Sequence, residues 1–499
     1  MKKIILPLII VLFSINISAQ KIELPKELRT YPKVTTYEEL GKKVDALDDI
    51  SDLLNVEIIG HSVEGRNIYA LKFSKSTFGE DHSKIKVLIF AQQHGNEQSG
   101  KEGALLLAEN LLRSENAYLF DNIDLAVIPQ INPDGAEQNK RRNAHDIDLN
   151  RNHLILTEPE TIALHRFFDR YLFEVNMDIH EYFPYSESWM TKGYRKNSAV
   201  TVGGNTNINI SKEIRDLSNK EALPFLQDQI SKAGYSSFAY CPGGPPSDNY
   251  LRYSTFDIND GRQSFGIQNS LSFIQEGMNG KDKFIENLQE RAYGQMTGMC
   301  ALVDYVFHNK DKISKLIASQ RDKLISEPKG ELVSIQMEHI KNGEKIHLPV
   351  FSLKSNTDSL IISDNFHAVV TSLYDVKKPE GYLIPVTNKK LLDWADRHTL
   401  KIEPYIPNDQ QLIEQYYISR IDSIDFEGDI IVNPEVEVST LKTRLKSGEF
   451  MFIPLDQLKS KLIVQALEPK SMLGLATYSP YQDLLEIGKI FPVTRLLKR

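Results

Sequence analysis

Two polar residues at close spacing, His94 and Glu97, are the first in this sequence whose chemistry suits a metal site. They lie in the segment HGNE, in which a glycine allows a sharp turn. A histidine and a glutamate three residues apart on such a turn can bind one metal ion. A catalytic zinc ion needs a third protein ligand and an open position for water. His94 and Glu97 therefore predict part of a metal site rather than a complete one.

His180 is the best candidate for the third ligand. It ends an apolar run that begins at Phe173, and Asp178 precedes it by two residues. Side chains two residues apart on a strand share one face, so Asp178 can accept the second ring N–H of His180 and fix its tautomer. His94, Glu97 and His180 therefore form a candidate three-ligand set.

A polar run at residues 141–152 is the third feature that points to a site. Its sequence, RRNAHDIDLNRN, includes Arg141, Asn150 and Arg151. Arginine and asparagine side chains are mostly exposed in folded proteins, so this run is not typical of a hydrophobic core. We expect it at a rim, where its side chains face the metal-binding residues.

Apolar runs precede these polar segments and must position them. Residues 87–90 are typical of a buried strand, and the Ala- and Leu-rich residues 103–112 are typical of a helix. The run 128–135, which ends in the turn NPDG, predicts another strand, and 173–180 predicts a third. Open α/β sheets bind ligands at the carboxyl ends of their strands. We therefore expect the three strand ends to deliver their polar residues to one rim.

Four motifs, HGNE, NPDG, DLNRN and DIH, occur here in the order in which they occur in the zinc carboxypeptidase family, the carboxypeptidase A-like metallopeptidases. The chain resembles this family over roughly residues 30 to 310. The turn at residues 60–69 resembles the family's early hairpin. Segments at 382–385 and 448–456 are similar to an extension carried by some bacterial members.

The resemblance implies one zinc ion per chain, held by His94, Glu97 and His180, the ligand set of carboxypeptidase A. It also implies that Glu276, which closes an apolar run, takes a proton from the attacking water and returns it to the leaving amine. Arg141 matches the family's arginine that stabilises the oxyanion.

The resemblance also implies how a substrate is held. Asn150 and Arg151 match the pair that binds the substrate's terminal carboxylate, a task that suits the planar fork of arginine. Arg262 lies near the residues that line the family's specificity pocket, and we expect it to favour an acidic terminal residue. The family's substrate-capping tyrosine has no clear match, although Tyr250 and Tyr253 lie at about the right distance before the proposed base.

The resemblance and the alternation of strand-like and helix-like runs predict an α/β fold. Its catalytic domain, a carboxypeptidase-like mixed-sheet α/β/α sandwich, is expected at residues 20–310. A helical linker at 311–330 and a smaller β-rich α+β accessory domain at 331–499 follow it. The Gly- and Pro-rich residues 243–246 predict a loop near the active-site rim.

A helical pattern crosses the predicted linker from residue 284 to 325, with an expected break near Asn309. Two helices are expected further on, at 388–397 and 409–417. Short strands are expected in the same region at 332–336, 347–353, 359–363, 368–374, 430–432 and 450–454. This tail shows no catalytic constellation, so we expect it to support structure or position substrate.

The first residues are typical of an export signal. A short basic start, an apolar run from Ile4 to Phe13 and the small residues before Gln20 predict a signal peptide at residues 1–19, cleaved after Ala19. No later apolar stretch reaches the ~20 residues that a membrane-spanning helix needs. We expect an exported protein, periplasmic or secreted, with no membrane span in the mature chain.

Composition excludes several classes of function. A net charge of −8 is unlike a nucleic-acid-binding surface, which needs a basic patch. The chain has 41% hydrophobic residues, enough for a large core, and only two cysteines, Cys241 and Cys300. Two cysteines form no disulfide framework, and we expect both to be unpaired.

These observations predict a zinc-dependent metallocarboxypeptidase that hydrolyses the last peptide bond of a peptide with a free C-terminus. Three alternatives stay open. One is an aspartoacylase-like amidohydrolase of N-acyl amino acids, which shares the HGNE and DLNR motifs. Another is a carboxypeptidase of peptidoglycan stem peptides. The third, a binding protein on a decayed peptidase scaffold, is disfavoured because every expected ligand and the base are present. The sequence does not predict the oligomeric state.

Overall fold

The computed structural model describes residues 33–498, except for residues 328, 408–410 and 427. The predicted signal peptide at residues 1–19 lies outside the described residues. Among those described, no helix combines the length and the apolar composition that a membrane span requires.

Residues 33–326, which we call the catalytic half after the domain that the sequence predicts there, contain one mixed sheet of eight strands, ordered β1-β2-β4-β3-β5-β10-β7-β8. The inner strands β4, β3, β5 and β10 are mutually parallel, whereas β2 and β7 run antiparallel to their inner neighbours. The strands are β1 (Leu54–His61), β2 (Asn67–Phe73), β3 (Ile85–Ala91), β4 (Ile123–Ile128), β5 (Val175–Tyr182), β7 (Val200–Gly203), β8 (Ser237–Ala239) and β10 (Leu271–Met278).

Helices cover both faces of this sheet. Along β3, Val87 and Ile89 belong to one buried cluster, whereas Leu88 and Phe90 belong to another, because alternate side chains of a strand point to opposite faces. The first cluster includes residues of α1 (Tyr37–Asp49), α2 (Gln98–Leu111), α6 (Lys212–Leu217), α7 (Leu223–Lys232) and α9 (Leu288–Ser326), and the second includes residues of α4 (Pro159–Tyr171) and α8 (Gly261–Gly266). The predicted mixed-sheet α/β/α sandwich is therefore confirmed.

The strand predicted at residues 128–135 is wrong. β4 ends at Ile128, and the NPDG turn instead begins a short helix, α3 (Pro133–Glu137). Asn132 caps this helix, since its side chain accepts a hydrogen bond from the Gly135 N–H, and Pro133 stands at the first helical position, where its missing N–H costs nothing.

The C-terminal half contains a second sheet of six strands, ordered β17-β20-β16-β21-β18-β19. Its elements are β16 (Gly381–Pro385), α10 (Lys389–Arg397), β17 (Glu403–Pro404), β18 (Gln411–Phe426), β19 (Asp429–Thr443), β20 (Phe450–Pro454), α11 (Ser460–Leu467) and β21 (Thr494–Lys498). This β-rich region with two helices agrees with the predicted fold class.

Two predictions about helices are wrong, one in this half and one in α9. The helix predicted at 409–417 begins outside the described residues, and from Gln411 onward the chain forms β18. The apolar spacing there fits a strand as well as a helix, and pairing with both β19 and β21 decides the outcome. The break predicted near Asn309 is absent, because α9 runs unbroken from Leu288 to Ser326 and the Asn309 side chain donates to the Tyr305 carbonyl one turn earlier.

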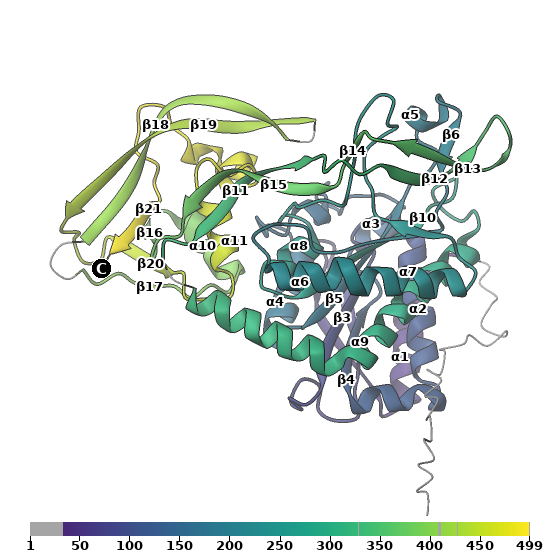
Figure 1. The fold of residues 1–499 in the computed structure, drawn as a ribbon. Coiled ribbons are helices and arrows are strands. Elements are labelled where there is room, and N and C mark those ends of the chain that lie inside the picture. Colours follow the sequence, from purple (N-terminus) through teal and green to yellow (C-terminus); the bar gives the residue numbers. More distant parts are fainter. Residues whose placement is uncertain (1–32, 328, 408–410, 427, 499) are drawn as a thin grey trace, which may run out of the picture.

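A further group of strands, which we call the arm (residues 332–377), reaches from the C-terminal half back over the catalytic half (Figure 1). It comprises β11 (Leu332–Ile340), β12 (Ile346–Ser352), β13 (Thr357–Ser363), β14 (Phe366–His367) and β15 (Val369–Lys377). Within the arm β11 pairs with β15 and β12 with β13. Two arm strands also pair with strands of the catalytic half, β12 with β6 (Tyr194–Lys196) and β14 with β9 (Leu251–Arg252). The two halves therefore share β-structure.

Helix α10 anchors the C-terminal half on the catalytic half. Trp394 is fully buried and donates its indole N–H to the Leu154 carbonyl at 2.9 Å, and His398 Nε2 lies 2.7 Å from the same oxygen. Residues of both halves therefore belong to one continuous hydrophobic core.

We predict that Trp394→Ala lowers the free energy of unfolding by about 3–5 kcal/mol, because it leaves a large cavity between the halves and removes the indole hydrogen bond to the Leu154 carbonyl. Guanidinium denaturation measures this change. Ile406→Ala is the control: Ile406 is 81% exposed, so its loss should change stability by less than about 0.5 kcal/mol. Equal stability of the two variants would contradict the anchoring role of Trp394.

Candidate metal centre and substrate pocket

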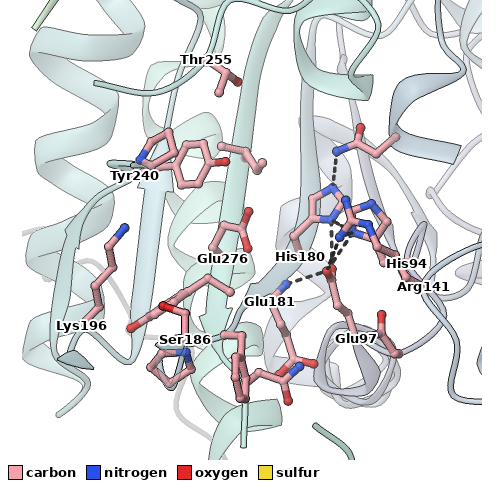
Figure 2. A pocket seen from close by; sticks show the side chains of 18 of the residues that line it. His94, Glu97, Arg141, His180, Glu181, Ser186, Lys196, Tyr240, Thr255 and Glu276 are labelled. Carbon is pink, nitrogen blue, oxygen red and sulfur yellow. Dashed lines mark hydrogen bonds and ion pairs between the residues drawn. The ribbon is translucent and has the colours of Figure 1, made fainter. Parts of the chain in front are cut away.

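The carboxyl ends of β3, β5 and β10 open onto a cavity of about 570 Å³ (Figure 2). Ala91 pairs with Ile179 across β3 and β5, and Glu276 pairs with His180 across β5 and β10. The carboxyl ends of the three parallel strands are therefore in register and lie at the same edge of the sheet. The cavity is lined mainly by polar residues. Its lining includes His94, Glu97, Arg141, Asn150, Arg151, His180, Glu181, Lys196, Tyr240, Thr255, Asp260, Glu276 and Lys283, together with Trp189, Gly243 and Gly244. The predicted loop at 243–246 thus contributes to the rim.

Three buried ligand groups converge at one side of the cavity. His94 Nδ1 lies 2.8 Å from Glu97 Oε1, and His180 Nδ1 lies 3.0 Å from Glu97 Oε2. The two Nδ1 atoms are themselves 3.1 Å apart. These are the three residues that the sequence predicted as metal ligands, and they form the candidate metal cluster among the described residues.

Carboxylates hold the outer ring nitrogen of each histidine. Asp178 Oδ1 lies 2.9 Å from His180 Nε2, as predicted from their spacing, and Asp148 Oδ1 lies 3.1 Å from His94 Nε2. A carboxylate at the outer nitrogen places the proton there and leaves Nδ1 free to bind a metal ion. Burial opposes ionisation of Glu97, but His94 and His180 outweigh it and lower the pKa of Glu97.

This donor set fits zinc. Two imidazole nitrogens and one carboxylate oxygen are the ligand types that catalytic zinc sites use. Bonds of about 2.0–2.1 Å to a tetrahedral ion would set its ligand atoms about 3.3 Å apart, which is close to the spacing within the cluster. When the outer ring nitrogens carry the protons, the facing Nδ1 atoms of His94 and His180 are both acceptors and cannot hydrogen-bond to each other. A cation between them would satisfy both.

Glu276 stands beside the cluster at the end of β10, and Figure 2 shows it between His180 and the wall that carries Tyr240 and Lys196. Its side chain is buried, and its Oε2 atom has no hydrogen-bond partner within the described chain. Burial raises the pKa of Glu276 to about 7. A carboxyl group of this kind can hold and release a proton near neutral pH.

Arg141 lies against the metal cluster and is 45% exposed. Its Nη1 atom is 3.2 Å from His94 Nδ1, and its Nε atom donates to Asp148 Oδ2 at 2.9 Å. The neighbouring Arg142 instead donates to the Asp146 carbonyl and does not line the cavity. Asp146 occupies a left-handed position with φ of 61°, which aspartate tolerates better than most residues.

Asn150 and Arg151 form one turn of 3₁₀ helix that is capped by Asp148. Asn150 is buried and Arg151 is exposed. The amide of Asn150 lies 3.2 Å from His180 Nε2, and its oxygen accepts from the Gly261 N–H. Arg141, Asn150 and Arg151 therefore meet at the same cavity as the predicted ligands and Glu276.

Arg262 does not present its charge to the cavity. It is fully buried, forms an ion pair with Asp260 at 3.0 Å and donates to Ser254 and Thr255. The expectation that Arg262 reads an acidic terminal residue is therefore corrected. α8 begins at Gly261, and the helical turn directs this side chain into the protein interior.

The tyrosines singled out by spacing also lie elsewhere. The ring of Tyr250 stacks on His367 of the arm, and the Tyr253 hydroxyl donates to Asn219. Two residues that the sequence analysis did not single out, Tyr240 directly after β8 and Lys196, also line the cavity. No local motif marks these positions; Lys196 ends β6, a strand that is placed by its pairing with the distant strand β12. Cys241 and Cys300 are both free, as predicted.

Several known proteins are similar to this chain. The zinc carboxypeptidase family model matches residues 42–240. Carboxypeptidase 2 of Trichophyton equinum is 23% identical over 450 residues, covering 87% of this chain and 81% of the relative. The human carboxypeptidase N catalytic chain is 29% identical over 199 residues, covering 30% of this chain and 43% of the relative. A metallo-carboxypeptidase structure from Burkholderia cenocepacia is 19% identical, with a TM-score of 0.42, and covers 55% of this chain and 69% of that chain.

The buried His94–Glu97–His180 cluster and the family match define a zinc-dependent metallopeptidase. It is a metallocarboxypeptidase, and residues 42–240 match the zinc carboxypeptidase family model.

We predict that zinc raises the thermal unfolding midpoint of the metal-free protein and that His180→Ala abolishes this rise. At a thousandfold excess of free zinc over Kd, binding adds about 4 kcal/mol of stability. Differential scanning calorimetry with and without zinc measures the shift, and elemental analysis should find one zinc per chain. His145→Ala is the matched control, because His145 is exposed and contacts Glu158 away from the cluster. An equal shift in both variants would assign the metal to another site.

Proposed function

We propose that this protein removes C-terminal residues from peptides that carry a free terminal carboxylate. One observation carries the proposal: a single cavity brings together the metal cluster, a buried carboxyl group with an unpartnered oxygen at Glu276, and the guanidinium groups of Arg141 and Arg151. A metal-assisted hydrolysis of a terminal peptide bond can use each of these groups: the metal ion to polarise the carbonyl, the carboxyl group to transfer the proton, and the guanidinium groups to bind the substrate's negatively charged oxygens.

His94, Glu97 and His180 would hold the zinc ion. When bound, zinc supplies Lewis-acid chemistry, which favours loss of a proton from water and attack on a polarised carbonyl. Asp148 and Asp178 orient the two histidines through their outer nitrogens.

Glu276 acts as the general base and then as the general acid. Its carboxylate takes the proton of the attacking water and passes it to the nitrogen of the departing amino acid. Burial favours both halves of this transfer, because it raises the pKa of the carboxyl group to about 7, close to neutral pH. The unpartnered Oε2 atom leaves the group free to face the reacting atoms.

Two arginines and Asn150 bind the substrate's oxygens. Arg141 stabilises the negative charge that develops on the carbonyl oxygen of the scissile bond, a role that suits its position against the metal cluster. Asn150 and Arg151 bind the terminal carboxylate. Arg262 takes no part, since its guanidinium is committed to Asp260.

The aspartoacylase-like alternative is not favoured, because the carboxypeptidase relative from Trichophyton equinum matches over 87% of this chain. A peptidoglycan stem peptide remains one kind of substrate within the proposed reaction.

We further propose that residues 1–19 direct export to the periplasm or the medium. Residues 20–310 and 331–499 are the proposed catalytic and accessory domains, joined by a helical linker at 311–330. The accessory domain would correspond to the extension of bacterial family members. The composition of residues 1–19 and the β-rich tail support these assignments.

We predict that the protein shortens peptides with free C-termini stepwise and leaves amidated peptides nearly untouched. A charge-assisted hydrogen bond contributes about 1.5–3 kcal/mol, so the free form should react roughly ten- to a hundredfold faster. Mass spectrometry of zinc-loaded protein with paired peptides measures the ratio. Arg151→Met should reduce it, whereas Arg142→Met, which removes an arginine outside the cavity, should not. Equal cleavage of free and amidated peptides by the unaltered protein would refute the carboxylate clamp.

We predict that Glu276→Gln retains one zinc per chain but lowers kcat by about 10²–10⁴, because glutamine cannot carry the proton. Single-turnover kinetics and elemental analysis check the two parts separately. Glu174→Gln is the control, since Glu174 pairs with Lys86 away from the cavity. A Glu276→Gln variant with full activity would exclude this residue as the base.

A further inference from the structure

One lysine in the cavity has no part in the proposed reaction. Lys196, the last residue of β6, lines the cavity on the side opposite the metal cluster (Figure 2). Its Nζ atom donates to the Cys241 carbonyl at 2.7 Å and lies 5.5 Å from the centre of the Trp189 ring. Among the described residues, no carboxylate forms an ion pair with it.

Lys196 therefore has no ion-pair partner within the described chain, and the Glu276 carboxyl in the same cavity only partly balances its charge. An ammonium group has three N–H donors, and the Cys241 carbonyl uses one of them. By contrast, two buried lysines of the described chain are paired, Lys84 with Asp124 and Lys459 with Asp169. Burial lowers the pKa of Lys196 to about 8, which reflects the cost of enclosing its charge. A carboxylate brought in by a ligand would offset that cost.

The arm holds Lys196 in place. Strand β6 is not part of the catalytic sheet, and it pairs with β12 of the arm, where Lys196 stands opposite Val350. Beneath it, one buried cluster joins both halves of the chain and comprises Trp189, Cys241 and Leu251 from the catalytic half with Ile346, Leu348, Val350 and Phe366 from the arm. The wall that presents Lys196 therefore depends on residues well outside the zinc carboxypeptidase match at 42–240.

We propose that Lys196 is a specificity residue that binds an acidic side chain of the substrate, on one of the two residues that flank the scissile bond. This inference rests on the proposed carboxypeptidase activity and adds its substrate class: peptides with glutamate or aspartate at one of the last two positions. The terminal carboxylate is not the proposed ligand of Lys196, because the proposed function assigns that group to Arg151 and Asn150.

Steady-state kinetics on two pairs of peptides tests the proposal. One pair differs by Glu or Gln at the last position, and the other differs in the same way at the position before it. The unaltered protein should prefer glutamate at one of the two positions by about ten- to a hundredfold in kcat/KM. Lys196→Met should reduce that preference to near unity, mainly through the acidic peptide, while Lys196→Arg should retain most of it.

Lys192→Met is the matched control. It removes the same charge four residues earlier, from an exposed lysine that pairs with Asp248 outside the cavity. This variant should keep the full Glu-over-Gln preference. Lys196→Gln, which keeps a donor for the Cys241 carbonyl, replaces Lys196→Met if that variant does not fold.

The outcomes separate this inference from the proposed function. An unaltered protein that cleaves neither peptide of either pair fails as a carboxypeptidase. One that cleaves Glu and Gln peptides equally well at both positions keeps its activity but overturns the role of Lys196, and the same holds if Lys196→Met retains the preference. Loss of the free-over-amidated ratio in Lys196→Met, with the Glu preference intact, would instead assign Lys196 to the terminal carboxylate and overturn the proposal.

Discussion

The convergence of His94, Glu97 and His180 on one point is the constraint on which the rest of the structure depends. Three buried polar groups in contact are costly unless a cation or a hydrogen bond satisfies each. The parallel alignment of β3 and β5 brings them together, and Asp148 and Asp178 fix the outward faces of the two histidines. The positions of the three ligand groups thus depend on the register of the strands, on the helices packed on both faces of the sheet and on the loop that carries Asp148.

The sequence predicts the parts of this site that are local. The short spacing of His94 and Glu97, and the placement of His180 at a strand end, follow from patterns within a few residues. The role of Asp148 does not, because it reaches His94 across 54 residues through the course of a loop. The direction of Arg262 also depends on where α8 begins, and no pattern in its segment shows that its side chain turns inward to Asp260.

The same limit explains the errors in the C-terminal half. Short strands there are predicted well, and residues 450–454 form β20 as expected. Residues 411–417 satisfy both helical and strand spacing, so pairing with distant strands decides between them. The arm is the most consequential feature that local patterns omit, because β12 completes its sheet with β6 of the catalytic half. A division into a catalytic and an accessory domain describes the chain order, but the cavity wall at Lys196 belongs to both.

The two cations Arg151 and Lys196 differ in how far neighbouring carboxylates balance their charges, and this difference bears on substrate selectivity. Although the Arg151 residue is exposed, the atoms packed around its guanidinium would lower its pKa; Asp257, Asp148 and Asp260 outweigh this effect and raise that pKa. Arg151 thus carries its charge at no net cost before any substrate arrives, and it can bind the carboxylate that every peptide with a free end possesses. At Lys196 the balance is reversed, because burial outweighs the attraction of Glu276 and lowers the pKa of the lysine. A ligand that supplies a second carboxylate relieves an existing electrostatic cost there, whereas a neutral ligand leaves it in place, so discrimination arises at Lys196 rather than at the better-compensated arginine.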